Sequence, residues 1–564
     1  MDAPLSGASA VHGSSITCDV AVIGSGAAAL TVALKAAVGG RSVVIIEKAA
    51  TIGGTSAMSG GMTWVPANHL AAAAGYHDSI EEAIQYVEAA APTGWLETEG
   101  ELLREQIAQG PDMLRFVEEH SALRFTVADV PDPMMDLPGA KRLGRLLSPV
   151  PINRKIVGKY GKLVRKSTLP LNMTYAESQK SNILRRPIHG GIRFGARMLK
   201  RYLSGGVSRG RAVIVGLLKG CMDYGCRLEL SCRAKRLILD EDGAVTGVDC
   251  VQNGKPLRVN VRNAVVLATG GFEWDAEMMA QHFATEFEYR SSPRTNTGDG
   301  HRMAQEAGAA FALMDQANIM VQPPIRYEGS VHGLPLVIHT DADAIIVDRS
   351  GRRFVNEYSF TINDHFMAVD ATTNKPKHLP AWIITHRPMV KRSLLIDWFK
   401  RYDKNWLVSA KTVEELAKRI GVDADNLQAT VRKFNLMAIA GVDTQFGRGE
   451  DEYGRALAKK FGLMRPIDTP PYVAIRCKPS VLGTKGGVRT NAKGQALRRD
   501  GSVIAGLYCA GNVMANPVGT RTPSQVGTTI GPYMTWGFIC AKQILSDNRR
   551  TEPTTLDNVH YPEM

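Results

Sequence analysis

A strand–turn–helix–strand unit at residues 19–48 constrains the fold more than any other part of the chain. Its first apolar strand runs into Gly24 and Gly26, where glycine allows a tight turn and a close approach of the backbone to a pyrophosphate. Ala29 is small enough for the following helix to pack on that strand, and the free N–H groups at the helix N-terminus favour phosphate. Glu47 lies 21 residues after Gly26, where a carboxylate can accept hydrogen bonds from ribose hydroxyls. An ordinary glycine-rich turn would leave Glu47 unexplained, so the spacing predicts a dinucleotide site.

The composition is that of a large soluble globular protein. The 564 residues are enough for two or more domains, and 44% hydrophobic with 22% charged residues is ordinary for a folded chain. The eight cysteines are scattered without a Cys-x-x-Cys spacing, which disfavours a disulfide framework or a metal site and fits a reducing cytosol. Residues 1–16 resemble a disordered leader, and no apolar run is long enough for a transmembrane helix. We therefore expect a cytoplasmic protein that binds no metal.

The net charge of +13 comes from one segment. Residues 141–211 hold 18 Lys and Arg residues and a single acid, Glu177, whereas the rest of the chain holds 50 basic and 54 acidic residues. The same segment carries apolar side chains such as Phe194, Leu199 and Leu203. A basic, amphipathic stretch is typical of a peripheral surface that contacts anionic lipid, and a solvated basic face or mobile insertion is the competing interpretation. No nucleic-acid partner is expected, because no recognition motif accompanies the charge.

Strand and turn signals recur in two separate blocks of the chain. Residues 236–248 predict a hairpin about Asp242-Gly243, and residues 264–272 form a buried apolar strand that ends in Thr-Gly-Gly. Near the C-terminus, a strand ends at Gly511, and a later helix has Gly527 at its N-terminus. That helix offers a second set of free N–H groups to an anion or an oxygen.

These signals predict an α/β fold with a nucleotide-binding domain that is split in the sequence. The Rossmann-like domain is expected at residues 17–285 and 476–564, and it contains the basic segment. Residues 286–475 differ in character and are expected to form an inserted α+β domain that binds or caps the substrate.

Seven separated motifs, in the same order along the chain, resemble the FAD-dependent fumarate reductase and 3-ketosteroid dehydrogenase flavoprotein superfamily. They are the Gly24–Glu47 unit, Gly53-Gly-Thr-Ser with Ser59-Gly-Gly, Ala268-Thr-Gly-Gly-Phe, Thr297-Gly-Asp-Gly, Gly351-Arg-Arg-Phe-Val-Asn-Glu, Gly506-Leu-Tyr-Cys-Ala-Gly-Asn and Gly527-Thr-Thr-Ile-Gly-Pro. They span nearly the whole chain. The resemblance implies FAD as the cofactor, with the first unit holding the ADP half and the Gly-Thr-Ser loop lining the isoalloxazine.

The first unit and the resemblance together give a set of candidate FAD-binding residues. They are Gly24, Gly26, Ala28, Ala29, Glu47, Lys48, Gly54, Thr55, Ser56, Ser59, Gly60, Gly61, Ala234, Thr269, Gly270, Gly271, Asp299, Gly511, Asn512, Gly527, Thr529 and Ile530.

The branch of the superfamily is indicated by a strand near residue 480. Fumarate reductases usually carry paired histidines there, whereas this chain has Leu482-Gly-Thr-Lys-Gly-Gly487, which looks like the ketosteroid dehydrogenases. The acid–base arginine that fumarate reductases present after the Phe-Val-Asn-Glu motif is also missing, because residues 358–364 contain no arginine. Both features favour the ketosteroid dehydrogenase branch.

Three active-site tyrosines of the ketosteroid Δ1-dehydrogenases are not matched in this chain. The loop at residues 130–139 has none, Thr361 falls near the second position, and residues 519–524 offer Arg521 or Thr522 at the third. A strict steroid Δ1-dehydrogenase is therefore not the only interpretation.

Desaturation beside a carbonyl needs a base for the α-proton, a donor for the enolate oxygen, and a flavin that accepts the β-hydride. The backbone N–H of Gly527 is the expected oxygen donor, because the family uses the equivalent glycine. Arg521 or Thr522 is the expected second donor, and Arg521 is also a candidate substrate contact. Tyr358 is the candidate base. Weaker candidates for the base are Tyr327, Tyr472 and Asp364.

The leading hypothesis is an FAD-dependent dehydrogenase that desaturates a 3-ketosteroid or a similar bulky cyclic ketone. The alternatives are a flavin-dependent reductase of a conjugated acid or enone, and a non-catalytic flavoprotein recruited to membranes by residues 141–211. Only one convincing dinucleotide unit is visible. We therefore expect the electrons to leave to an external acceptor, such as a quinone or a carrier protein.

Overall fold

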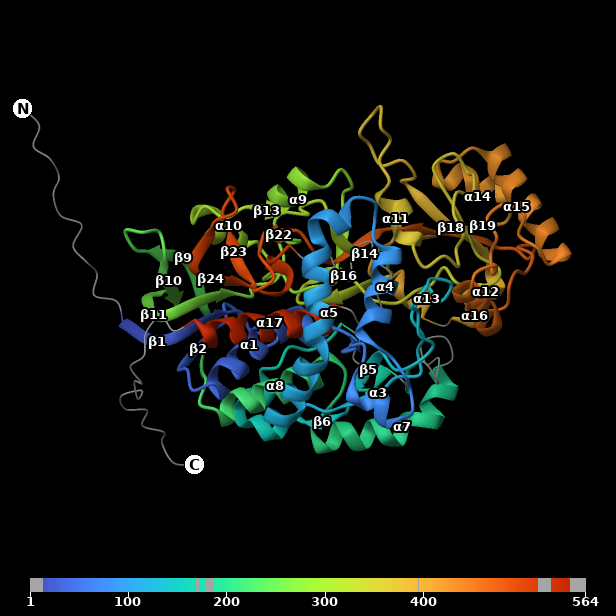
Figure 1. The fold of residues 1–564 in the computed structure, drawn as a ribbon. Helices are drawn as coiled ribbons and strands as arrows, with labels where there is room; N and C mark the ends of the chain where they lie inside the picture. Colours follow the sequence, from blue (N-terminus) through green and yellow to red (C-terminus); the bar gives the residue numbers. More distant parts are fainter. Residues whose placement is uncertain are drawn as a thin grey trace, which may run out of the picture.

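A mostly parallel sheet joins the two ends of the chain. The computed structural model describes residues 14–168, 172–175, 177, 178, 187–393, 395–515 and 529–547. In this sheet β1 pairs in parallel with β2 and β11, and β11 pairs in parallel with β24 (Figure 1). The strands lie in the order β23 (Gln495–Leu497), β24 (Val503–Cys509), β11 (Lys255–Leu267), β1 (Ser14–Ile23), β2 (Val43–Ile46) and β8 (Arg227–Glu229). Because β24 comes late in the sequence and β1 early, the prediction of a split nucleotide domain is confirmed.

Apolar strands form this sheet because both of its faces are covered. All four residues of β2 are buried, as is typical of a parallel strand packed on both sides. The helix α1 (Ala27–Val38) packs against both α8 (Gly210–Asp223) and the last helix, α17 (Ile530–Ser546). A Cβ atom at Gly537 of α17 would lie 2.5 Å from the backbone oxygen of Ala28. The two helices therefore touch backbone to backbone at the point where the first and last motifs of the sequence meet.

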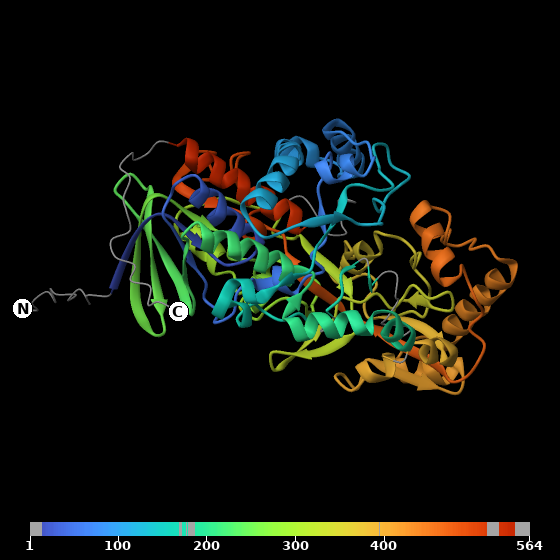
Figure 2. The ribbon, with the colours of Figure 1, turned by 90° about the horizontal axis from the view of Figure 1, so that it is seen from below.

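The predicted hairpin about Asp242-Gly243 is confirmed. It consists of β9 (Cys232–Leu239) and β10 (Val245–Gln252), which pair antiparallel, and β10 pairs with β11. This hairpin extends the main sheet at one end of the molecule (Figure 2).

A second, antiparallel sheet organises the other end of the molecule. Its strands lie in the order β17 (Ile345–Val347), β18 (Ala381–His386), β20 (Tyr472–Cys477) and β19 (Leu407–Ala410). Neighbouring residues of a strand face opposite sides, so Ile345 packs in the core with Leu416 and Phe434. Ile346 faces the opposite core, with Phe366. Apart from Cys477 at the end of β20, both cores are made of residues from 286–475. This agrees with an α+β unit in this part of the chain. The domain boundaries themselves stay predictions.

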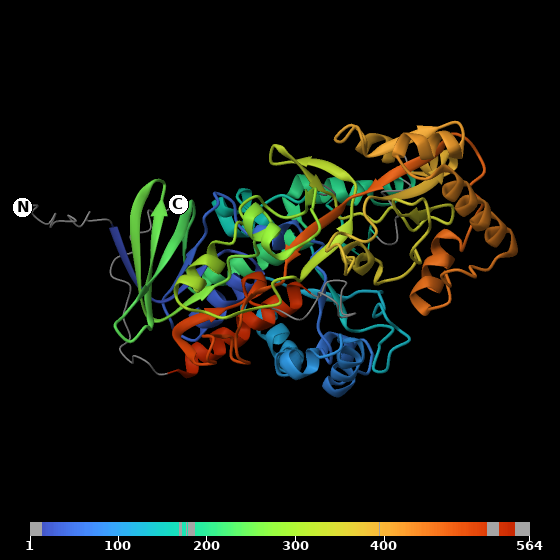
Figure 3. The ribbon, with the colours of Figure 1, turned by 90° about the horizontal axis from the view of Figure 1, so that it is seen from above.

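A continuous run of strand links the unit built on the first sheet, called the nucleotide-binding unit, with the unit built on the second sheet, called the second unit. Lys478 alone separates β20 from β21 (Pro479–Thr484), which pairs with β12 (Tyr289–Arg290) and β14 (Ala317–Val321). Figure 3 shows this run crossing from the second sheet towards the nucleotide-binding unit.

Residues 54–207 contribute further helices and short strands around the nucleotide-binding unit. The elements of this part are α2 (Gly54–Met58), β3 (Thr63–Trp64), α3 (His69–Ala73), α4 (Ile80–Ala90), α5 (Trp95–His120), β4 (Phe125–Val127), β5 (Leu146–Pro149), β6 (Ile152–Asn153), η1 (Arg154–Lys162), α7 (Pro187–Ser204) and β7 (Gly206–Val207). The helix α7 lies on the outside of the molecule (Figures 1 and 2). No helix among the described residues is both long and apolar enough to cross a bilayer.

The remaining elements lie in the middle and late parts of the chain. They are α9 (Ala276–His282), α10 (Asp299–Glu306), β13 (Phe311–Ala312), β15 (Pro324–Tyr327), β16 (Ser330–Gly333), α11 (Ile362–Met367), α12 (Arg387–Arg392), α13 (Ile396–Phe399), α14 (Val413–Ile420), α15 (Ala424–Ala440), α16 (Glu452–Phe461), β22 (Gly487–Val488) and η2 (Gly511–Val513).

Candidate active site

A cavity opens where β1, β2 and β11 end, which is where open α/β sheets bind nucleotides. It is lined by segments that lie far apart in the sequence and that the motifs predicted to meet. The predicted cofactor residues that line it are Gly24, Gly26, Ala28, Glu47, Lys48, Gly54, Thr55, Ser56, Ala234, Thr269, Gly270, Asp299, Gly511 and Asn512.

The N-terminus of α1 lines the part of the cavity where the pyrophosphate is predicted. Gly24 adopts φ +118° and its N–H donates to the carbonyl of Ile46 at 2.8 Å, which fixes the turn between the first two strands. Gly26 is the N-cap of α1, and the N–H of Ala27 donates to the hydroxyl of Ser56 at 3.1 Å. The next amides of the first turn have no helical carbonyl to pair with, so they are available to a pyrophosphate.

Glu47 lies directly after β2, at the end of the cavity where the ribose is predicted. One carboxylate oxygen accepts a hydrogen bond from the Ser25 hydroxyl at 2.6 Å, and the other accepts from the backbone N–H of Ala49 at 2.8 Å. Burial raises the pKa of Glu47, and these two hydrogen bonds oppose that shift. Each oxygen keeps a lone pair, so the carboxylate is oriented and can still accept from a ribose hydroxyl.

A cluster of charges borders the same end. Asp299 at the start of α10 forms ion pairs with Lys48 at 3.0 Å and with Arg233 at 2.8 Å. Burial opposes ionisation of Asp299, but hydrogen bonds from Arg233 and the charge of Lys48 lower its pKa. Lys48 is therefore fixed by a carboxylate that is 251 residues away in the sequence.

Buried polar side chains from other segments also line the cavity. The hydroxyl of Thr269 is buried and has no hydrogen-bond partner among the described residues. Asn296 donates to Thr55 at 3.0 Å and to the buried carboxylate of Glu273 at 2.7 Å. An orphaned hydroxyl beside a helix N-terminus and an oriented carboxylate fits a long nucleotide that carries both polar and ring groups, as FAD does. These residues therefore fit FAD.

Several predicted cofactor residues do not line the cavity. Ala29 is fully buried in the packing of α1, and the hydroxyl of Ser59 donates to the carbonyl of Ser56 at 2.8 Å. The other predicted residues outside the lining are Gly60, Gly61, Gly271, Thr529 and Ile530. Gly527 lies outside the described residues. For these positions a direct contact with the cofactor stays a prediction.

Several lining residues were missed by the sequence analysis, among them Ser25, Asn296 and Tyr533. Ser25 lies between the two glycines of the first turn, so its position was a signal that could have been used. Asn296 and Tyr533 also line the cavity, but their neighbours are distant in the sequence. Only the fold brings these two to the site.

The predicted catalytic residues are distributed differently. Arg521, Thr522 and Gly527 lie outside the described residues, so their roles stay predictions. Tyr358 is fully buried, and its hydroxyl donates to the carbonyl of Gly462 at 2.6 Å. It does not line the cavity, and its assignment as the base is likewise untested.

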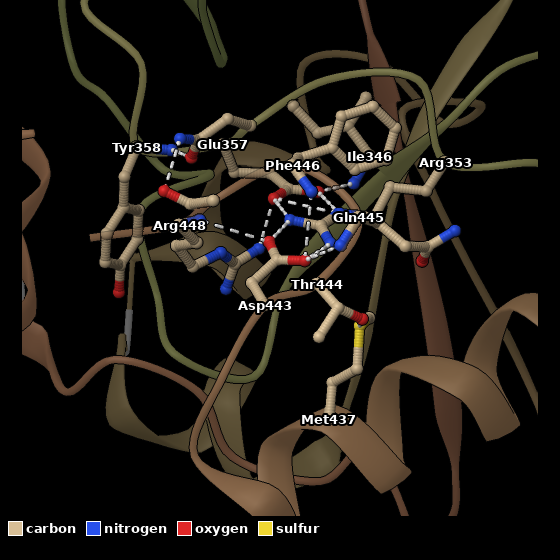
Figure 4. A network of polar contacts seen from close by, with 12 residues as sticks. Ile346, Arg353, Glu357, Tyr358, Met437, Asp443, Thr444, Gln445, Phe446 and Arg448 are labelled. Atoms are coloured by element: carbon tan, nitrogen blue, oxygen red, sulfur yellow. Dashed lines mark hydrogen bonds and ion pairs between the residues drawn. The ribbon is translucent and has the colours of Figure 1, made fainter. Parts of the chain in front are cut away.

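Figure 4 shows Tyr358 beside a buried network of charges in the second unit. Arg353 binds both Glu357 and Asp443 at 2.6 Å, and Arg448 also binds Glu357. All four side chains are 0–1% exposed. The Arg448 guanidinium lies 4.9 Å from the centre of the Tyr358 ring, so the network sits against the predicted base.

Comparison with known proteins gives matches over nearly the full chain. Residues 19–525 match the family described as FAD binding domain. The chain is 34% identical to 4-oxocyclohexanecarboxylate 2-dehydrogenase of Sinomonas cyclohexanicum, over 94% of this chain and 93% of that one. It is 35% identical to 3-oxosteroid 1-dehydrogenase of Mycobacterium tuberculosis, over 93% of this chain and 98% of that one.

A solved structure is also similar. The crystal structure of 3-ketosteroid delta1-dehydrogenase from Sterolibacterium denitrificans, in complex with 1,4-androstadiene-3,17-dione, has a TM-score of 0.85 and 30% sequence identity to this chain. The match covers 94% of this chain and 100% of that one.

Proposed function

Because the chain belongs to the FAD-binding flavoprotein family and to its 3-ketosteroid dehydrogenase-like branch, we propose that it desaturates the carbon–carbon bond beside the carbonyl of a bulky cyclic ketone. It is an FAD-dependent oxidoreductase that acts on CH–CH groups. One observation carries the proposal. Two relatives named for dehydrogenation of ring ketones match more than nine-tenths of this chain at 34–35% identity.

The residues of the chain have separable tasks in this reaction. Bound FAD supplies the two-electron chemistry. Glu47 would orient the ribose, and the N-terminus of α1 would hold the pyrophosphate, since both line the cavity. We propose that the N–H of Gly527 donates a hydrogen bond to the substrate oxygen and that Arg521 or Thr522 is the second donor. Tyr358 is the proposed base that accepts the α-proton. One well-placed oxygen donor contributes about 3 kcal/mol to the barrier reduction.

A ring-ketone screen tests this function. The FAD-loaded protein is mixed with a dye acceptor and, separately, with 3-ketosteroids and with cyclohexanones that carry a carboxylate. The expected result is a product two hydrogens lighter than its ketone, together with bleaching of the visible flavin absorption when air is absent. A product two hydrogens heavier, formed by pre-reduced protein from enones or conjugated acids, would favour the reductase instead. A flavin that stays oxidised with every ketone would overturn the proposal.

We further propose that the basic segment binds an anionic membrane surface and that the electrons pass to an external quinone or carrier protein. In α7, Phe194 is buried, but Ile192 is 83%, Leu199 57% and Leu203 70% exposed. These three exposed residues share one face of the helix, since they are seven and four residues apart. A helix that turns one apolar face to solvent and carries basic residues beside it suits the boundary of an anionic bilayer.

The charge around α7 supports the same partner. Glu177, the one acid in residues 141–211, points inward and pairs with Arg201. Lys200 and Arg197 are exposed next to the apolar face, and Arg197 also pairs with Glu177 at 3.0 Å. Glu177 is the one acid among the 18 basic residues of this segment, so the surface keeps a net positive charge that complements anionic lipid headgroups.

Acidic substitutions on α7 are expected to abolish vesicle binding. Leu199→Glu with Leu203→Glu removes two side chains that each contribute about 1.5–3 kcal/mol on full burial, so co-flotation with anionic vesicles should fall more than tenfold. The matched control is Leu436→Glu with Ile439→Glu, an equally exposed apolar pair on α15. Binding of the wild type should weaken as salt rises. Equal flotation of the α7 variant and the wild type would remove the membrane from the proposal.

A further inference from the structure

A buried lysine–tyrosine–asparagine chain forms part of the wall of the FAD cavity. The ammonium nitrogen of Lys485 lies 2.5 Å from the phenol oxygen of Tyr533, and that phenol donates to the side-chain oxygen of Asn512. Lys485 is 1% exposed. Tyr533 and Asn512 line the cavity, whereas Lys485 does not. The amine therefore reaches the cofactor site only through the tyrosine.

Two separate parts of the fold place this pair. Lys485 follows the last residue of β21, and its backbone N–H donates to the carbonyl of Gln316 at 2.8 Å. Tyr533 lies in the first turn of α17. The amine also lies 4.8 Å from the centre of the Tyr533 ring, so the side chain is held along the aromatic face as well as at the hydroxyl. A long, flexible side chain is thereby fixed in one position.

Two opposing effects set the pKa of Lys485. Burial lowers the pKa of Lys485 to about 7, and the negative charge of Glu273 opposes this shift. Glu273 is itself fully buried and accepts hydrogen bonds from Asn296 and Thr484 rather than pairing with the lysine. Burial, followed by the charge of Glu273, raises the pKa of Tyr533, so that the phenol keeps its proton. Of these three hydrogen-bonded residues, Lys485 is thus the one that changes charge near neutral pH.

We propose that Lys485, acting through Tyr533, stabilises the reduced form of FAD and couples its reduction to the uptake of a proton. Reduction by a hydride brings two electrons and one proton to the flavin and adds one negative charge to the cavity. A protonated amine at this wall compensates that charge, and a neutral amine becomes protonated from solvent to do so. Lys485 is a positioning residue in this scheme. The inference rests on FAD as the cofactor and does not depend on which ketone is the substrate.

The direction of the pH dependence follows from the charge. Below about pH 7, Lys485 is already protonated in the oxidised protein, so reduction takes up only the proton of the hydride. Reduction raises the pKa of the amine, because the nearby charge becomes more negative. Between the pKa of Lys485 in the oxidised protein and its higher pKa in the reduced protein, two protons therefore accompany two electrons. Above that range the number returns to one.

The test is a reduction-potential titration of the FAD-loaded protein without substrate, between pH 6 and pH 9. In the wild type the proton uptake should rise from one to two per two electrons as the pH passes about 7. In Lys485→Met it should stay at one. At pH 6 the ratio of oxidised to reduced flavin at a fixed potential should increase at least tenfold, which is about 30 mV for a two-electron couple. Because no ketone is present, failure of the desaturase proposal would not affect this outcome.

Two further variants keep the experiment decisive. Tyr533→Phe removes the phenol link but keeps the lysine, and it should reduce the extra proton uptake. Tyr508→Phe removes a comparably buried phenol that does not line the cavity, and it should leave the titration unchanged. If Lys485→Met does not retain FAD, Tyr533→Phe decides the question by the same titration. A lysine variant that keeps the potential and pH dependence of the wild type would overturn the inference.

Discussion

Replacing Gly24 with valine is expected to leave the protein without FAD. A Cβ atom at this position would lie 2.3 Å from the carbonyl oxygen of Ala268 and 3.0 Å from its carbonyl carbon. Both are backbone atoms of the residue that directly follows β11 and lines the cavity, so they cannot move aside as a flexible side chain could. The residue also has φ +118°, which a β-branched residue strongly disfavours. The turn must therefore shift, and the amides of α1 lose their alignment with the pyrophosphate.

The expected loss is at least tenfold in FAD affinity, which corresponds to about 1.4 kcal/mol. It is measured as the flavin content of the purified protein and by titration of the apoprotein with FAD. Gly40→Val is the matched control. Gly40 also has a positive φ, of +81°, but a Cβ atom there meets nothing within 4 Å. Gly40→Val should therefore cost only backbone strain and retain the cofactor. Equal flavin content in the two variants would contradict the steric argument.

Removing the charge of Glu357 is expected to destabilise the second unit strongly. Glu357 accepts hydrogen bonds from Arg353, Arg448 and the backbone N–H of Ile346, and it is fully buried. Asp443 still pairs with Arg353 when Glu357 becomes glutamine, but Arg448 is left as a buried charge without a counter-ion. Breaking a buried pair in this way costs about 3–5 kcal/mol. The measurement is the midpoint of thermal unfolding.

The double variant Glu357→Gln with Arg448→Met tests the cause. If the cost comes from an uncompensated charge, removing that charge should restore part of the stability. Glu414→Gln, in an exposed pair with Lys418 on α14, should have little effect. A double variant that is less stable than the single one would show that packing, rather than charge, limits this core.

The carboxylate of Glu357 also makes the stability of the second unit depend on pH. Burial opposes ionisation of Glu357, but the charges of Arg448 and Arg353 lower its pKa below the ordinary value. A depressed pKa contributes stability that is complete above the unfolded value, near pH 4.3, and is lost as the pH falls through the folded value. The wild type should therefore lose stability in acid below about pH 4, and Glu357→Gln should lose less over that range.

The sequence predicted those parts of the site that depend on local pattern. Gly24, Gly26 and Glu47 lie within one strand–turn–helix–strand unit, whose spacing alone specifies their positions. The hairpin about Asp242-Gly243 was likewise predicted from a short turn signal and two apolar runs. In both cases the interacting residues are close along the chain, so the local sequence pattern is enough to predict their contact.

The parts that the sequence did not predict depend on distant contacts. Asn296 reaches Thr55 across 241 residues, and Lys485 reaches Tyr533 across 48 residues and two different elements. No periodicity or turn signal specifies such pairs, because they depend on how the sheets and helices pack. The contacts of Tyr358 are distant in the same way, because its hydroxyl donates to the carbonyl of Gly462 and its ring lies beside the guanidinium of Arg448. Its role as the base stays a prediction.

The meeting of the first and last motifs has a consequence for how the protein is made. Gly24 and Glu47 leave the ribosome early, whereas Asn512 and Tyr533, which complete the same cavity, leave it more than 460 residues later. At about 5–20 residues per second, on the order of half a minute or more separates the two events. Until β24 and α17 arrive, β11 lacks one parallel neighbour and α1 lacks the helix that covers it. A nascent chain therefore cannot complete its flavin site until β24 and α17 have been made, and FAD loading has to wait for them.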